Sequence, residues 1–90
     1  MLSSLELKIA KIHRLPEGGR LKAFVDVSVN DALLIKGLRV VDGKAGLFVS
    51  MPQEQGRDKR WYDLVRCLNE DVQGMISQKV ISAYETAPNN

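Results

Sequence analysis

The feature that most constrains this chain is a pair of apolar runs on either side of a short, glycine-bearing turn. The runs cover residues 38–42 and 47–51, and the turn begins with Gly43 and ends with Gly46. Both glycines can take a positive φ at little cost, and the β-branched and aromatic residues beside them favour a pleated, half-buried surface. Pro52 cannot donate to a strand ladder, so it closes the second run. We therefore predict a β-hairpin at the centre of a sheet.

Alternating apolar residues predict two strands before this hairpin. Residues 5–12 alternate, but the phase slips near Ile9 and Ala10, which predicts a β-bulge. Residues 20–29 alternate most regularly in the chain, with one apolar and one mostly polar face. That pattern is typical of an antiparallel sheet with one face in water. A strong turn signal at residues 16–19 separates the two strands.

A second turn and an almost wholly apolar segment lead into the hairpin. Asn30 and Asp31 both tolerate left-handed conformations, so we predict a two-residue turn there. Residues 32–41 are nearly all apolar, which predicts a central strand covered on both sides. After the hairpin, residues 53–60 are predicted to form a polar loop and residues 61–65 a short last strand.

The C-terminal part of the chain has the pattern of one amphipathic helix. Asn69 is a good N-cap, and the two acidic residues after it suit the helix dipole. Apolar residues recur at three- and four-residue spacing over 72–84, so the helix is predicted to lie on the sheet. Gly74 costs about 1 kcal/mol relative to alanine, which close backbone packing would justify, and Pro88 is predicted to mark the end of the helix.

The order of these elements predicts the fold class. Strands followed by one helix, without βαβ alternation, indicate an α+β fold with a mostly antiparallel sheet of about five strands and one C-terminal helix. Ninety residues are enough for one domain, so residues 1–90 are expected to form a single domain. A chain of this length has a small core, and pairing with a second copy would stabilise it.

Composition excludes several classes of protein. Apolar residues at 44% and charged residues at 27% are typical of a globular protein and not of a disordered one. The single cysteine, Cys67, cannot form an intramolecular disulfide or by itself a structural zinc site, which suits a reducing cytoplasm. No apolar run approaches the ~20 residues of a membrane span, and the N-terminus lacks the pattern of a leader. We therefore expect a cytoplasmic protein with no membrane partner and no cofactor.

Residues for catalysis are sparse. His13 is the only histidine and ends a predicted strand among basic residues, where general-base work is not favoured. Cys67 has no histidine nearby in sequence; Arg66 could lower its pKa, but a buried structural thiol is the simpler interpretation. Asp42 is explained by its turn, and no phosphate-cradling glycine loop precedes a helix. We expect neither an enzyme nor a small-molecule substrate.

Nucleic-acid binding is the sharper hypothesis. Arg57, Lys59 and Arg60 cluster directly before Trp61 and Tyr62. Lysine and arginine release counterions from phosphates, and an aromatic ring beside them can stack on an unpaired base. The alternative is that the two aromatic residues start a strand, one of them facing the core, while the charges are solvated and partly cancelled by an intervening aspartate.

The hairpin also resembles the signature of the SpoVG family, stage V sporulation protein G. The resemblance is carried by Val-Val-Asp-Gly at residues 40–43 and Gly-Leu-Phe-Val-Ser-Met-Pro at residues 46–52, and it extends from about Leu5 to Tyr84. Members of that family are small bacterial regulators linked to septum formation; several bind nucleic acid, and they form homodimers by joining their sheets. The resemblance implies a non-enzymatic regulator of cell-division septation that contacts DNA or RNA as a homodimer.

The charge pattern differs from the pattern of the family. The positions that are usually basic in the family hold other residues here: Glu54, Gln55, Gln73 and Met75. Positive charge stands instead at Arg57, Lys59, Arg60 and Arg66, which we predict to contact phosphates, Arg66 more weakly than the others. A rival hypothesis is a protein-interaction module that docks a division or regulatory partner through a sheet edge or the helix.

A second basic set lies on the first two strands and the turn between them: Lys8, Arg14, Arg20 and Lys22. We interpret these residues as a solvated face of the sheet. If two copies pair, the same residues would extend a surface that follows the phosphates of a nucleic acid.

Overall fold

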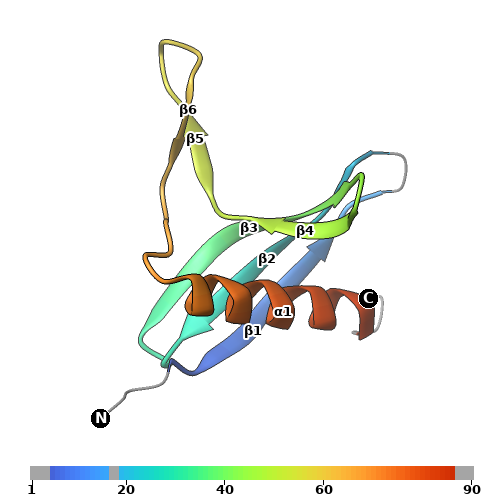
Figure 1. Cartoon of the computed structure of the whole chain (residues 1–90), viewed down its shortest axis with the longest axis vertical. Coiled ribbons are helices and arrows are strands. Elements are labelled where there is room, and N and C mark those ends of the chain that lie inside the picture. Colours follow the sequence, from blue (N-terminus) through green and yellow to red (C-terminus); the bar gives the residue numbers. More distant parts are fainter. Residues whose placement is uncertain (1–4, 17–18, 87–90) are drawn as a thin grey trace.

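The computed structural model describes residues 5–16 and 19–86. Its elements, in chain order, are β1 (Leu7–Arg14), β2 (Leu21–Val29), β3 (Leu33–Gly43), β4 (Gly46–Ser50), β5 (Gln53–Gln55), β6 (Trp61–Asp63) and α1 (Glu70–Thr86) (Figure 1).

The first four strands form one antiparallel sheet in the order β1-β2-β3-β4. β5 and β6 pair with each other in a separate two-stranded sheet, which stands away from the main sheet as an arm (Figure 1). The predicted α+β class with one C-terminal helix is therefore confirmed. The prediction of a hairpin at the centre of the sheet is wrong. Of the two strands of the hairpin, β3 is internal, but β4 is an edge strand of the sheet.

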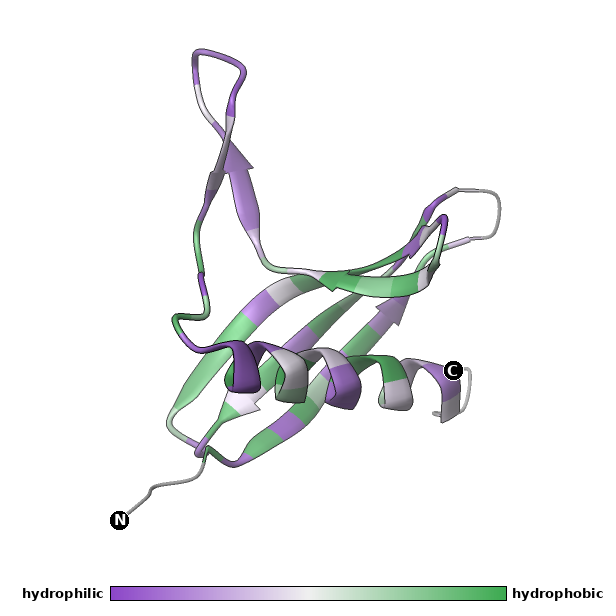
Figure 2. Cartoon of the chain, in the orientation of Figure 1, coloured by the Kyte–Doolittle hydropathy of each residue, from purple (hydrophilic) through white to green (hydrophobic). Residues whose placement is uncertain are grey.

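The core lies between α1 and one face of the main sheet. Within the described residues it consists of Leu7, Ala23, Val25, Val27, Leu38, Val40, Ile76 and Val80, all buried. Polar and apolar residues alternate along β1 and β2, whereas the arm is largely hydrophilic (Figure 2). Ile76 and Val80 stand one helical turn apart, so both reach the sheet from the same side of α1. Met75, which the spacing assigns to that side, is instead 42% exposed.

The predicted bulge in β1 is confirmed, and the turn after β2 has the predicted conformation but not the predicted length. The register between β1 and β2 shifts between Ile9 and Lys11, where the alternation slips. Asn30 and Asp31 have φ values of 53° and 51°, and the N–H of Ala32 closes this turn on the carbonyl of the last residue of β2 at 2.9 Å. These side chains tolerate the left-handed region better than other non-glycine residues, so the turn forms where it was predicted. Its length differs from the prediction: Val29 pairs with Leu33, so three residues and not two connect the strands.

β3 is not covered on both sides as predicted. Leu33 and Leu34 point to opposite faces and are 68% and 51% exposed, so the beginning of β3 is covered on neither side. A second bulge interrupts β3 opposite Asp26, whose carboxylate accepts the N–H of Gly37 at 3.1 Å. Gly37 has a φ of 83°, a conformation that glycine adopts without strain.

The two glycines of the signature turn have different roles. Gly46 has a positive φ of 122°, as expected, but Gly43 is not among the residues with positive φ. A Cβ at Gly43 would come within 2.9 Å of the Phe48 ring, so this glycine instead allows the ring to lie close to the backbone. The register pairs Gly43 with Gly46 and closes the hairpin over two residues.

The N-cap of α1 is as predicted, but the close packing expected around Gly74 is not found. The Oδ1 of Asn69 accepts the backbone N–H groups of Asp71 at 2.7 Å and Val72 at 3.3 Å, which confirms the N-cap. A Cβ at Gly74 would meet nothing within 4 Å, so close packing does not explain this residue. Pro88 and residues 17–18 of the first predicted turn lie outside the described residues.

Candidate nucleic-acid interface

The arm begins where the main sheet ends. Buried Pro52 follows β4, and its carbonyl accepts the N–H of Leu64, which closes the foot of the arm at 2.9 Å. β5 and β6 pair in register from Gln53 opposite Asp63 to Gln55 opposite Trp61. The predicted polar loop over residues 53–60 is thus a strand in its first part. This pair of strands has no core on either side, so its polar residues remain in water.

A tight turn forms the tip of the arm. The N–H of Gly56 donates to the carbonyl of Arg60 at 2.8 Å, and the N–H of Lys59 donates to the carbonyl of Gly56 at 3.0 Å. Lys59 has a φ of 71°, an uncommon conformation for a residue with a long side chain. Asp58 stabilises the turn with both oxygens: one accepts the Arg60 N–H at 3.0 Å, and the other accepts the Tyr62 hydroxyl.

The carboxylate of Asp58 therefore forms its hydrogen bonds within the arm. The Tyr62 hydroxyl, and after it the Arg60 N–H, hold the pKa of Asp58 below its ordinary value, while the same bond raises the pKa of Tyr62. Within residues 5–16 and 19–86, no carboxylate forms an ion pair with Arg57, Lys59 or Arg60, and all three are exposed. The structure brings these three predicted site residues together on one loop.

Arg66 is separated from that loop. It lies between β6 and α1, at the foot of the arm, and its guanidinium bonds the Asp63 carboxylate at 3.0 and 3.2 Å. The amide of Gln53, and after it Arg66, lower the pKa of Asp63. An exposed ion pair of this kind contributes little stability, but it partly neutralises the charge of Arg66. The fourth predicted site residue is thus neither near the tip nor unpaired.

The two aromatic residues of the arm point to opposite sides, as successive strand residues do. Trp61 is 54% and Tyr62 49% exposed, so the alternative in which one of them faces the core is wrong. The Tyr62 ring lies against Gly56, where an added Cβ would come within 2.8 Å of it. The Trp61 ring lies over Arg39 of the main sheet, 5.8 Å from the guanidinium carbon. In the sequence, Arg39 was recognisable only as one of two cations, with Lys36, in a largely apolar run.

The second basic set does not form one face. Lys8 pairs with Asp31 at 3.1 Å, and this hydrogen bond raises the pKa of Lys8. Arg14 donates to the carbonyl of Tyr84 at 2.6 Å and lies over its ring, on the side of the sheet that α1 covers. The first two strands therefore distribute their positive charge over both faces of the sheet.

Sites of other kinds find less support. Among the described residues, no three His, Cys, Asp or Glu side chains gather where they could hold a metal ion, and no helix is long and apolar enough to cross a bilayer. His13 is exposed, and Cys67 is only half-buried, against the edge of the core.

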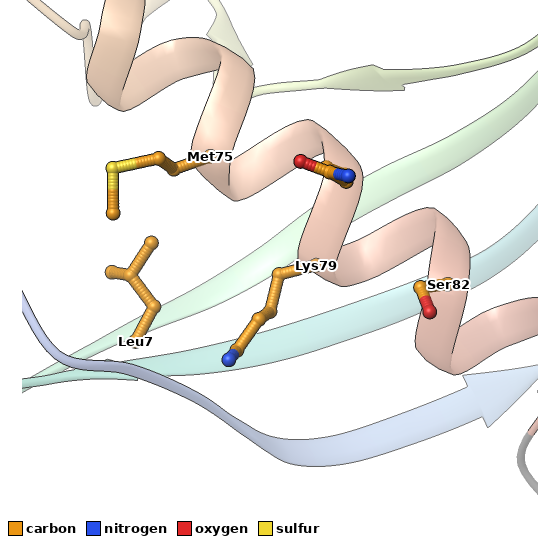
Figure 3. A pocket seen from close by; sticks show the side chains of 5 residues that line it. Leu7, Met75, Lys79 and Ser82 are labelled. Carbon is orange, nitrogen blue, oxygen red and sulfur yellow. The ribbon is translucent and has the colours of Figure 1, made fainter.

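A cleft of about 350 Å³ lies between α1 and β1 (Figure 3), lined by Leu7, Met75, Gln78, Lys79 and Ser82. Its lining contains neither a carboxylate nor a histidine for acid–base chemistry.

Comparisons with known proteins agree with the resemblance noted in the sequence. The SpoVG family model matches residues 4–86. A relative from Listeria monocytogenes, named "Putative septation protein SpoVG 1", is 31% identical over 92% of this chain and 81% of its own length. Relatives named "Putative septation protein SpoVG" include one from Desulforudis audaxviator, 31% identical over 90% of this chain and 92% of its own length, and one from Staphylococcus carnosus, 32% identical over 83% and 70%. The chain therefore belongs to the SpoVG family.

Proposed function

We propose that this chain is a non-enzymatic regulator of septation that acts in the cytoplasm by binding DNA or RNA, and that the tip of its arm contacts phosphates. The observation that carries the proposal is the tip loop with its three exposed cations, Arg57, Lys59 and Arg60, none of which pairs with a carboxylate among the described residues. The names of the relatives support the septation role.

The arm suits contact with a polyanion. It holds the cations away from the main sheet (Figure 1), so they can approach a backbone without steric conflict from the rest of the protein. Because Asp58 bonds the turn and Tyr62, it keeps the loop in one shape and does not pair with the cations. Lysine and arginine in such a position supply affinity and register, whereas sequence preference requires contacts with bases.

We further propose that two copies pair through β4. An edge strand offers unpaired backbone groups to another chain, and natural edges are usually protected by charge or bulges. β1 has both forms of protection, with Lys8, Lys11 and a bulge, whereas β4 contains no charged residue. A hollow of about 270 Å³ borders β4 and the segment that precedes α1. The two tip loops of such a dimer would give one polyanion two points of contact.

The test of the proposed function is a salt titration of binding to mixed-sequence DNA and RNA. We expect affinity to fall steeply as salt rises, because each neutralised phosphate releases counterions. Replacing Arg57, Lys59 and Arg60 together by alanine should reduce the slope of log K against log salt by about 2 to 3, the value for that many lost phosphate contacts.

A matched control removes three cations elsewhere. Arg20, Lys44 and Lys79 are exposed and lie outside the arm, so replacing them by alanine changes the net charge equally and should leave the slope nearly unchanged. An equal loss in both variants would show that only net charge matters and would contradict the site. Absence of binding at low salt would overturn the proposed function and favour the rival hypothesis of a protein-interaction module.

A further inference from the structure

The face of the main sheet opposite α1, here called the open face, carries aromatic and cationic residues that the tip loop does not use. α1 packs on the other face, so residues that alternate with the core residues lie on the open face. The register sets His13, Phe24 and Arg39 side by side across β1, β2 and β3. Phe48 of β4 stands opposite Val41, on the same face.

Arg39 joins the open face to the arm. Its guanidinium carbon lies 6.0 Å from the centre of the Phe24 ring and 5.8 Å from the centre of the Trp61 ring. Its Nε is buried without a hydrogen-bond partner among the described residues. The side chain is thus held by two rings and not by a carboxylate, which leaves its charge uncompensated. Phe24, Arg39 and Trp61 form one continuous layer from the sheet to the arm.

Two rings of this surface are open to solvent. Trp61 is 54% and Phe48 47% exposed. The Phe48 ring lies against Gly43, whose missing Cβ lets the ring come close to the backbone. Exposed aromatic rings on a sheet face offer stacking surfaces for unpaired bases, because every base has a π-face and a duplex keeps that face covered.

Charge on the open face favours a polyanion over a second copy. Lys11, Lys22 and Arg39 lie on this face, and the carboxylate of Asp26, which lies among them, accepts the N–H of Gly37. A symmetric dimer joined through this face would bring the same cations of both copies together, which is unfavourable. A strand of nucleic acid would instead neutralise them.

We propose that the open face binds a single strand of DNA or RNA, with unpaired bases stacked on Phe48 and Trp61 and phosphates beside Lys22 and Arg39. The inference rests on the proposed function, since the strand would continue to the phosphate contacts at the arm tip. It adds a substrate class: the preferred ligand is single-stranded.

The test compares two ring variants, Phe48→Leu and Trp61→Leu. Binding is measured at fixed salt to a mixed-sequence single strand of about 12 nucleotides, within the usual reach of a small single-strand-binding surface, and to the duplex of the same sequence. We expect each variant to lower single-strand affinity about tenfold, as the loss of one stacked base does. Duplex affinity and the salt slope should stay unchanged. Leu68→Ala is the control, because Leu68 is an exposed apolar residue in the segment directly before α1 and not on the main sheet.

The outcomes separate this inference from the proposed function. Unchanged single-strand affinity in both ring variants, with binding still lost in the tip variant, overturns the inference alone. An equal loss for strand and duplex also overturns it. A Trp61→Leu variant that alters the sedimentation coefficient overturns it too, because Trp61 lies outside β4 and the face would then be a contact between copies. Circular dichroism of each variant confirms that it is folded. Wild-type protein that binds neither ligand overturns both proposals.

Discussion

One carboxylate determines the shape of the arm tip. Asp58 accepts hydrogen bonds from the Arg60 N–H and the Tyr62 hydroxyl, and both bonds favour its ionised form. A carboxyl group with a lowered folded-state pKa adds stability above its unfolded pKa, and this contribution disappears as the pH falls through the folded value. The tip should therefore keep its shape at neutral pH and lose order only below pH 3.8, the ordinary pKa of an aspartate.

Replacing Tyr62 by phenylalanine tests this arrangement. The variant removes the hydroxyl that contributes most to the shift, so the pKa of Asp58 should rise toward 3.8. The carboxyl carbon of Asp58, followed by NMR against pH in both proteins, gives the two midpoints directly. Asp58→Asn is the reciprocal change and should lower the pKa of Tyr62 toward 10.0, because the acceptor that stabilises the protonated phenol becomes neutral. Identical Asp58 midpoints with and without the hydroxyl would contradict the hydrogen bond.

Residues with a local conformational role were predictable from the sequence. Asn69 bonds the first amides of α1, and Asn30 and Asp31 take the positive φ that these two residue types tolerate. Arg66 shows the limit of this reasoning. Its charge is readable in the sequence, but its pairing with Asp63 depends on the path of the chain after β6.

Within α1, Gly74 is a weak point without a packing role. A Cβ there would enter open space, and its φ is not in the left-handed region. Gly74→Ala should raise the free energy of unfolding by about 1 kcal/mol, the difference in helix propensity. Urea denaturation measures the change. Gly37→Ala is the contrasting variant: it also meets open space, but its φ of 83° should make it destabilising by roughly 1–2 kcal/mol. A less stable Gly74→Ala protein would show that the glycine has a role at this site.

Elements that bury one face were predictable, and the arm was not. β1 and β2 show the predicted alternation, because the core requires apolar residues on one side of each strand. β4 ends before Pro52, as predicted. β5 contains only glutamine and glutamate, which are poor strand formers, and it becomes a strand through pairing with β6. Neither face of the arm packs on the core, so nothing imposes a period on its sequence.

At the scale of the whole molecule, strand order is set by pairing between distant residues. Three consecutive hairpins fix the order β1-β2-β3-β4, which the turns alone predict. That β6 leaves the main sheet depends on how the chain turns after Pro52, and no local pattern encodes this choice. The candidate site shows the same difference between local and distant contacts. The tip cations are adjacent in the sequence and were predictable as a group. The contact of Trp61 with Arg39 was not, because it joins residues of two separate sheets.

The difference between the two sheet edges leads to a prediction about assembly. If β4 pairs with β4 of a second copy, sedimentation velocity should show a dimer whose fraction rises with protein concentration, by mass action. Hydrogen exchange should slow over the same range at those backbone amides of residues 47–50 that alternate with the amides bonded to β3, because pairing gives partners to groups that face water in the monomer. The amides of β1 serve as the internal control, since that edge is protected by Lys8, Lys11 and its bulge. Protection gained by β1 and not by β4 would reverse the assignment of the edge, and a monomer at every concentration would remove it.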